Sequence, residues 1–419
     1  MTRRVTDAVV VAIAALLLLS TVQTLGPERG TIVSAAALDP LTLAKTGIRL
    51  IALVASGWLW LVSPGSFRAN LSGPTVWFLA FFGLAAATAV VSANPFVSVS
   101  RALSFAIVLV FATSAAAMYV RQGREAAYWR GVSVLLLVTA LPMFAVVLVR
   151  GPVIESYDTV ARLGGIYQPN QLGAIAGIVI LISVMSLLRK RLVVLSLWAL
   201  PVAVYVAIFT LSRGSWIAIA VGLLAAWLSV RPLRVWTVPL VGILVTTIML
   251  GVATGVLATD RGVFAAVRRG QTETELRSGT GRTGLYTYLL EQQFPKRPLL
   301  GFGYQMLSEE EIATDARPYD TAIARALGWP AQQAHNFLLS TLIGTGLIGL
   351  SLYLVAIGTL LWRVGSAAKS GDPIAVDQLV LLAAILTHAM VDTTLVTGVD
   401  HAFIAAGAVA GLASARAVR

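Results

Sequence analysis

Residue types suited to phosphate chemistry gather in one long polar stretch, residues 258–335, of an otherwise apolar chain. Arg282 lies within this stretch and His335 ends it. A guanidinium presents a rigid fork of N–H donors that suits a diphosphate, and a water-accessible imidazole suits a general base for a sugar hydroxyl. If the chain carries out chemistry, we expect it where this stretch meets the apolar segment that follows His335. The alternative for a single histidine at such a junction is a hydrogen-bonding role at a helix end.

A second arginine stands between two apolar segments that almost touch in the sequence. Arg213 is flanked by Ser212 and Gly214, and the apolar segments begin within a few residues on either side. Arg213 must therefore lie at the surface of the layer that those segments cross. There it is suited to bind a diphosphate, with Arg282 as the second prong of a clamp. The alternative is a simple turn followed by an interfacial aromatic residue, Trp216.

Further polar residues are candidates for supporting roles. Arg162 and Asn170 belong to a segment, residues 162–171, whose glycines and proline favour irregular backbone that lines a cavity. His388 and Asp392 are four residues apart, hence on one helical face, and suit a buried structural pair, a proton relay or an orienting group. Asp400 and His401 are candidates for the same cluster. The supporting candidates are Arg162, Asn170, Asn336, Arg49, His388 and Asp392.

The composition is that of a polytopic α-helical membrane protein. Of the 419 residues, 58% are hydrophobic and 12% are charged, and the mean hydropathy is +0.84. A soluble domain of this size needs a far more charged surface. Cysteine is absent, which excludes disulfides and a thiolate nucleophile. The histidines and acids match no metal-binding motif such as H-E-x-x-H, so we expect no metal.

Apolar runs long enough to cross a bilayer recur along the whole chain. We predict twelve spans, at residues 8–25, 43–62, 75–91, 102–120, 131–149, 172–188, 192–211, 216–230, 235–257, 336–362, 374–395 and 399–413. Most of the net charge of +12 falls between spans, on alternate sides, so the positive-inside rule explains it without nucleic acid. This pattern places both termini in the cytoplasm and residues 258–335 outside. The domains are then spans one to nine (1–257), an outer loop bearing part of the active site (258–335) and spans ten to twelve (336–419).

Basic residues also stand at the outer ends of the spans, against the expected bias. A charge in the apolar layer costs about 2.5–3.5 kcal/mol, so it needs a partner or a purpose. We predict an outward-facing cationic cavity that binds an anionic ligand, and the alternative is that each side chain anchors itself on lipid phosphates. The outer cations are Lys45, Arg49, Arg101, Arg162, Arg213 and Arg282.

Several short motifs occur in an order that resembles the O-antigen ligase and polymerase superfamily. The resemblance covers residues 162–363, and twelve spans with one large outer loop between spans nine and ten resemble the ligase branch. The motifs, in order, are Gly165…Pro169-Asn170, Ser212-Arg213-Gly214, Gly281-Arg282, Gly301-Phe302-Gly303, His335-Asn336 and Gly344-Thr345-Gly346-Leu347-Ile348-Gly349.

The resemblance implies a glycosyltransferase C-like membrane fold and a glycan donor carried on undecaprenyl diphosphate. In the ligase branch the acceptor is the lipid A–core oligosaccharide of lipopolysaccharide, on the periplasmic face of the bacterial inner membrane. By position, Arg213 and Arg282 would hold the donor diphosphate, and His335 would activate or orient the acceptor hydroxyl. The resemblance further implies inversion at the anomeric carbon without a metal or nucleotide. A diphosphate is a good leaving group that mainly needs its developing charge stabilised, as arginines do.

Alternative functions share the predicted cationic site. A polymerase joins one lipid-linked glycan to another, and a protein O-oligosaccharyltransferase delivers the glycan to Ser or Thr. A transporter of an anionic lipid-linked substrate would use a similar cavity without chemistry. The position of His335, and the lack of symmetry between the two halves of the sequence, favour an enzyme.

Overall fold

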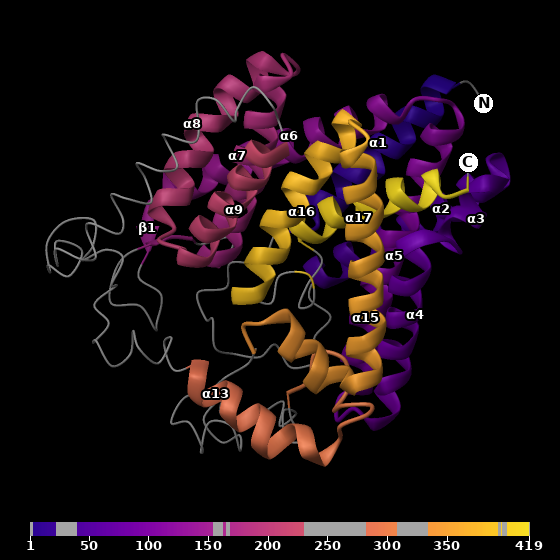
Figure 1. Ribbon diagram of the computed structural model, residues 1–419, viewed down its shortest axis with the longest axis vertical. Coiled ribbons are helices and arrows are strands. Elements are labelled where there is room, and N and C mark those ends of the chain that lie inside the picture. The colour runs from indigo at the N-terminus through magenta and orange to yellow at the C-terminus, as the bar shows by residue number, and fades with distance from the viewer. Residues whose placement is uncertain are drawn as a thin grey trace, which may run out of the picture. The chain divides into compact units, whose positions relative to one another are not determined.

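The computed structural model describes residues 3–21, 40–153, 162–164, 168–229, 282–307, 334–392, 395 and 400–418. These residues are mainly helical (Figure 1). The chain divides into two compact units. The first unit comprises Met1–Thr139, Arg282–Val364 and Ala389–Arg419, and the second comprises Ala140–Gly281 and Gly365–His388.

Helices dominate both units. The first unit contains α1 (Arg3–Leu19), α2 (Pro40–Val62), α3 (Pro64–Asn70), α4 (Gly73–Ala87), the 3-10 helix η1 (Thr88–Val91), α5 (Pro95–Arg121), α13 (Arg282–Tyr288), the π-helix η3 (Leu289–Gln293), the 3-10 helix η4 (Phe294–Lys296) and α17 (His401–Arg416). The second contains β1 (Pro152–Val153), β2 (Arg162–Leu163), α7 (Pro169–Leu188), α8 (Val193–Phe209) and α9 (Arg213–Ser229). The helices that contribute residues to both units are α6 (Glu125–Arg150), α15 (Phe337–Lys369) and α16 (Pro373–Val391).

Every predicted span except residues 235–257 overlaps a helix within the described residues, with ends that differ by up to several residues. That span, and residues 258–281 and 308–333 of the predicted outer loop, lie outside the described residues. In the part of the chain that the structure describes, seven helices are long and apolar enough to cross a membrane, and α8 and α9 are shorter apolar helices. The protein is therefore a multi-pass α-helical membrane protein, as the composition predicted.

Some predicted boundaries were wrong, for local reasons. Within the predicted outer loop, α13 begins at Arg282, and Leu285 and Leu289 are both buried one turn apart. The helix expected to reach residue 395 ends at Val391, where side chains from elsewhere bind its last carbonyls. Hydropathy also missed α3, whose buried face is polar: Asn70 Nδ2 donates to Ser114 Oγ at 2.9 Å.

In the first unit, α5 packs against α2, α3, α4 and α17. Small residues allow the closest approach, since a Cβ on Gly411 of α17 would lie 2.8 Å from the Thr113 backbone. An aromatic cluster then joins four helices to the segment after η4. Its members are Phe81 and Phe82 of α4, Phe105 of α5, Tyr353 of α15, Phe403 of α17 and Tyr304.

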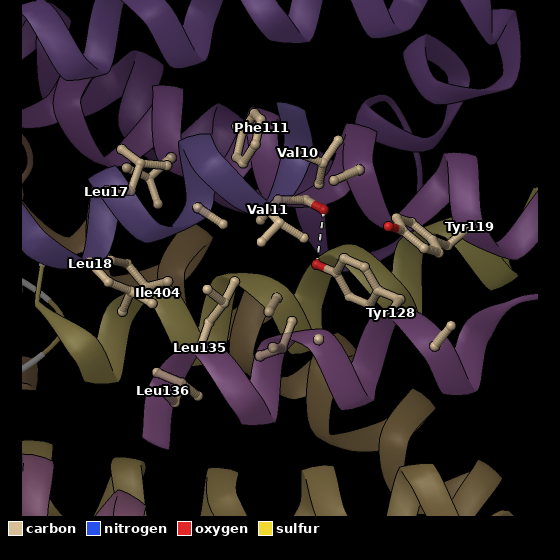
Figure 2. Close-up of a pocket in the computed structure, with 18 residues that line it drawn as sticks. Val10, Val11, Leu17, Leu18, Phe111, Tyr119, Tyr128, Leu135, Leu136 and Ile404 are labelled. Carbon is tan, nitrogen blue, oxygen red and sulfur yellow. Dashed lines mark hydrogen bonds between the residues drawn. The ribbon is translucent and has the colours of Figure 1, made fainter. Parts of the chain in front are cut away.

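An apolar pocket opens among α1, α5, α6 and α17 within the first unit (Figure 2). Leu17 and Leu18 of α1 face Leu135 and Leu136 of α6 across it. Its polar groups include the hydroxyls of Tyr119 and Tyr128, and the latter donates to the carbonyl of Ala112 at 3.1 Å.

The long helix α15 is broken at Gly346, which has φ +66 and ψ −170. A neighbouring segment, residues 297–304, which we call the strap, supplies the missing backbone partners. The N–H groups of Phe302 and Gly303 donate to the carbonyls of Ile343 and Gly344 at 3.0 and 2.9 Å, before the break. After it, the N–H groups of Leu347 and Ile348 donate to Pro298 and Leu299 at 2.8 and 3.3 Å. Irregular backbone inside a membrane protein is thereby satisfied by protein.

In the second unit, α7 packs against α8 and α9. A Cβ on Gly222 of α9 would lie 2.6 Å from the side chain of Leu181 on α7, so these helices also meet through a glycine. An ion pair of 2.7 Å between Arg189 and Asp377 ties α7 to α16. The two short strands are antiparallel and place Val153 opposite Arg162.

Candidate active site

Arg162 anchors the backbone that leads into α9. Its side chain, on β2, is only 4% exposed. Its Nε donates to the carbonyl of Thr210 at 2.7 Å, and Nη2 donates to Asn170 Oδ1 at 3.0 Å. The guanidinium therefore ties the end of α8 to the first turn of α7.

Arg213 is the first residue of α9 and follows a tight turn. Leu211 has φ +49, and the buried Ser212 Oγ accepts from the N–H of Ser215 at 3.4 Å and from its hydroxyl at 2.8 Å. This is the arrangement of an N-cap residue, which fixes where the helix begins. Arg213 is therefore held, half-buried, at a fixed helix N-terminus.

His388 joins the same group of residues through Ser215. His388 Nε2 lies 3.1 Å from Ser215 Oγ, which lies 3.3 Å from the carbonyl oxygen of Asn170. A Cβ on Gly173 of α7 would lie 2.5 Å from Ser215 Oγ, so only glycine allows this approach. The second unit thus brings together predicted residues Arg162, Asn170, Arg213 and His388. We call these residues, with Ser212 and Ser215, the α9 group.

A second set of predicted residues meets at the end of α16 in the first unit. Arg282, the first residue of α13, donates from Nη1 to the carbonyl of Val391 at 2.7 Å. A cation at this position also complements the negative C-terminal end of the helix dipole. The bond uses one of the five N–H donors of the guanidinium and fixes its orientation.

His335 lies two residues before the start of α15, with φ +49. Its Nδ1 is 3.6 Å from Asp392 Oδ1, and the two side chains are 28% and 7% exposed. This distance exceeds that of a hydrogen bond, so the interaction is electrostatic and strengthens when the imidazole carries a proton. The arrangement is therefore suited to an imidazole that accepts a proton and is stabilised afterwards.

Tyr286 and Asn336 hold the backbone around His335. The Tyr286 hydroxyl donates to the carbonyl of His335 at 3.3 Å, and burial raises the pKa of this phenol although Arg282 opposes the shift. The phenol therefore stays protonated and remains a donor. Asn336 Nδ2 donates to the carbonyl of Met390 at 3.0 Å, and its Oδ1 caps α15 by accepting from Leu339 N–H at 3.0 Å. Arg282, Tyr286, His335, Asn336 and Asp392 form what we call the α16 end group.

Three other predicted residues make their described contacts elsewhere. Arg49 of α2 donates from Nη1 to Ser104 Oγ of α5 at 2.8 Å. Asp400 caps α17 by accepting from the N–H of Phe403 at 2.7 Å. His401 lies between Thr21 and Thr139, with nitrogen–oxygen distances of 3.1 and 3.4 Å. Asp400 and His401 therefore have structural contacts of their own, and Asp400 also lies close enough to Asp392 for their charges to interact, as the predicted cluster requires.

Sequence reasoning assigned no role to Ser215, Tyr286 or Gly173. The spacing of Ser212 and Ser215 is typical of a helix N-cap and was a usable signal. Nothing local to the sequence indicated that Ser215 lies beside His388, or that Tyr286 bonds to the His335 carbonyl. Those contacts depend on how distant helices pack.

Comparison with known proteins bears on this arrangement. Residues 199–354 match a family model described as O-Antigen ligase. The matched segment contains Arg213, Arg282 and His335. Comparison with curated proteins gives no match. Members of the matched family are glycosyltransferase-like ligases and polymerases that use lipid-linked glycans. This match supports the resemblance to the O-antigen ligase superfamily that the motifs predicted.

Proposed function

We propose that this protein is an O-antigen ligase. It transfers a glycan from undecaprenyl diphosphate to the lipid A–core oligosaccharide on the periplasmic face of the bacterial inner membrane. The observation that carries the proposal is the α16 end group, in which Arg282, His335 and Asp392 meet within one unit. The family match over these residues supports it.

The proposal includes a topology. Twelve spans cross the membrane, both termini are cytoplasmic, and residues 258–335 form a periplasmic loop between spans nine and ten. The distribution of Arg and Lys between apolar segments supports this orientation. The division into residues 1–257, 258–335 and 336–419 follows from it.

Arg213 and Arg282 bind the donor diphosphate. A cation at the N-terminus of α9 opposes the helix dipole, and an anion placed there removes this conflict. Arg282 is oriented by its bond to Val391 and keeps further N–H groups for a phosphate. As the bond between the sugar and the diphosphate breaks, these cations stabilise the negative charge that develops on the leaving group.

His335 acts on the acceptor hydroxyl. The hydroxyl oxygen attacks the anomeric carbon, and the carbon–oxygen bond to the diphosphate breaks on the opposite face, which inverts the configuration. The diphosphate leaves with the bonding electrons, while the imidazole takes the hydroxyl proton. Asp392, 3.6 Å away, then stabilises the imidazolium, and the bond from Tyr286 keeps the His335 backbone in place.

A transfer assay tests the proposal. Purified protein in detergent is given undecaprenyl-diphosphate-linked glycan and rough lipopolysaccharide, with no added metal or nucleotide. Arg213→Ala, Arg282→Ala and His335→Ala are compared with Arg130→Ala, which removes an exposed arginine of α6. We expect transfer in the wild type and in Arg130→Ala, and losses of about 100- to 1,000-fold in the other three variants.

The products separate the alternatives. Lengthening of the donor glycan without lipopolysaccharide would identify a polymerase. Transfer to a Ser- or Thr-containing peptide would identify a protein O-oligosaccharyltransferase. Donor binding that depends on Arg213 and Arg282, without transfer to any acceptor, would favour a transporter.

A further inference from the structure

Arg49 is half-buried, and it differs from three other half-buried or buried arginines of the described chain. Arg162, Arg189 and Arg416 each have a carboxylate, amide or carbonyl oxygen as partner. Among the residues that the structure describes, Arg49 has one hydrogen-bond partner, the neutral hydroxyl of Ser104 at 2.8 Å, and its Nε is buried without one. Its charge therefore lacks a matching anion in this part of the protein.

The position of Arg49 within its helix makes the lack of a matching anion unusual. It is six residues into the apolar window Leu43–Val62 of α2, roughly 9 Å along the helix at 1.5 Å per residue. An ionisable residue inside a span marks a functional site by default, because water does not solvate its charge there. An arginine that merely anchors itself on the membrane surface extends outward, whereas this one is bonded to the neighbouring helix α5.

The register of α2 and α5 places two more cations beside it. Arg49 contacts Ser104, and Trp60 Nε1 donates to Ser114 Oγ at 2.9 Å. Because residue numbers rise together along both helices, α2 and α5 run in the same direction. Lys45 precedes Arg49 by one turn, and Arg101 precedes Ser104 by one turn, so both cations stand at the same end of the helix pair.

We infer that Lys45, Arg49 and Arg101 form a binding site for the phosphate group of a membrane lipid, between α2 and α5 and made of other residues than the α9 group and the α16 end group. Three cations match the charge and the acceptor oxygens of a phosphate. The Ser104 hydroxyl donates to the carbonyl of Ser100 at 2.6 Å and accepts from Arg49, so it orients the guanidinium rather than binding the phosphate itself. A lipid is the appropriate carrier because its tails remain in the apolar layer while its phosphate reaches the level of Arg49. The site needs no transfer chemistry, so it stands independently of the proposed function.

Lipid-dependent thermal stabilisation in detergent tests the inference. The delipidated wild type, Arg49→Gln and the matched control Arg130→Gln are each titrated with dioleoylphosphatidylglycerol. A ligand that binds only the folded state raises the Tm as its concentration exceeds the Kd. We expect stabilisation by several degrees in the wild type and in Arg130→Gln, and an apparent Kd at least tenfold weaker in Arg49→Gln. An equal Kd in all three proteins would overturn the inference.

Two further titrations test which part of the lipid is recognised. Dioleoylglycerol, which lacks the phosphate, is expected to give no stabilisation that depends on Arg49. Inorganic phosphate is expected to give none at the same concentrations, and equal stabilisation by it would overturn the assignment to a lipid. If Arg49→Gln fails to fold, Ser104→Ala replaces it. That variant keeps the charge but loses the hydroxyl that orients it, so the Kd should weaken about threefold or more, and an unchanged Kd would count against the site.

Discussion

Two departures from regular helix in the described residues, the turn before α9 and the break in α15, satisfy their backbone groups in different ways. Before α9, side chains satisfy the backbone groups: Arg162 donates to the Thr210 carbonyl, and Ser212 caps the helix. At the break in α15, other backbone satisfies these groups. N–H groups of the strap donate to the carbonyls of Ile343 and Gly344, and carbonyls of the strap accept from the N–H groups of Leu347 and Ile348.

This difference shows how each region responds to substitution. A turn held by side chains is lost when one polar group is removed, because a buried acceptor is then left unpaired. A break held by backbone tolerates most side-chain changes but not an added Cβ, since Gly301 and Gly346 approach the opposing backbone too closely for one. The side-chain bonds before α9 fix the position of Arg213. The backbone bonds at Gly346 fix the first part of α15, which begins directly after His335 and Asn336.

The largest effect is expected from Gly346→Ala. Alanine at φ +66 is strained, and its Cβ would collide with the carbonyl group of Leu299. The two penalties together amount to about 2–6 kcal/mol, enough to prevent folding. We expect loss of monodisperse protein in size-exclusion chromatography. The matched control is Gly358→Ala in the same helix, where the Cβ meets nothing within 4 Å. A well-folded Gly346→Ala protein would show that the strap does not define the break.

A smaller but substantial effect is expected from Arg162→Met. Methionine fills much of the volume but leaves the Thr210 carbonyl and Asn170 Oδ1 without their donor. At about 1–2 kcal/mol for each orphaned acceptor, the lower part of the usual range because Asn170 is only half-buried, the free energy of unfolding should fall by about 2–4 kcal/mol. Thermal unfolding in detergent measures this, with the exposed Arg130→Met as the control. Glycan transfer should fall as well, since Arg213 follows the turn that Arg162 holds. Unchanged stability would mean that the turn is held by its local caps alone.

Much of the fold was predictable from the sequence, because apolar runs of membrane length leave few alternatives. The chemistry-bearing residues were also visible, since Arg213, Arg282 and His335 are polar residues beside apolar segments. Their surroundings were not predictable. Gly301-Phe302-Gly303 and Gly344-Thr345-Gly346 were visible as separate motifs, and only the structure shows that they hydrogen-bond to each other. Likewise, the contact of His388 with Ser215 joins α16 to α9, and no local pattern encodes it.

A moderate effect on transfer alone is expected from Asp392→Asn. The amide keeps the shape but loses the charge that stabilises a protonated His335. We expect transfer to slow about tenfold, which corresponds to ~1.4 kcal/mol of barrier, with little change in Tm. A double-mutant cycle with His335→Ala tests the mechanism. If Asp392 acts through His335, adding Asp392→Asn to His335→Ala causes no further loss. Multiplied losses would instead assign Asp392 an independent role.

The smallest effect on stability is expected from Asp7→Asn, which removes an ion pair that holds neither of the two irregular backbone segments. Asp7, which precedes the first predicted span, is bonded to Arg124 at 2.7 Å, and both side chains are about one third exposed, at 27% and 34%. The hydrogen bond from Arg124 lowers the pKa of Asp7, so the carboxylate stabilises the fold above its unfolded pKa of about 4. That stabilisation is lost as the pH falls through the lower folded value. Solvent limits it to less than about 1 kcal/mol. Asp7→Asn should therefore lower the Tm slightly at pH 7, and the difference from wild type should shrink as the pH falls below the unfolded pKa and in high salt. A difference that did not shrink at low pH would mean that Asp7 contributes through packing or a neutral hydrogen bond rather than through its charge.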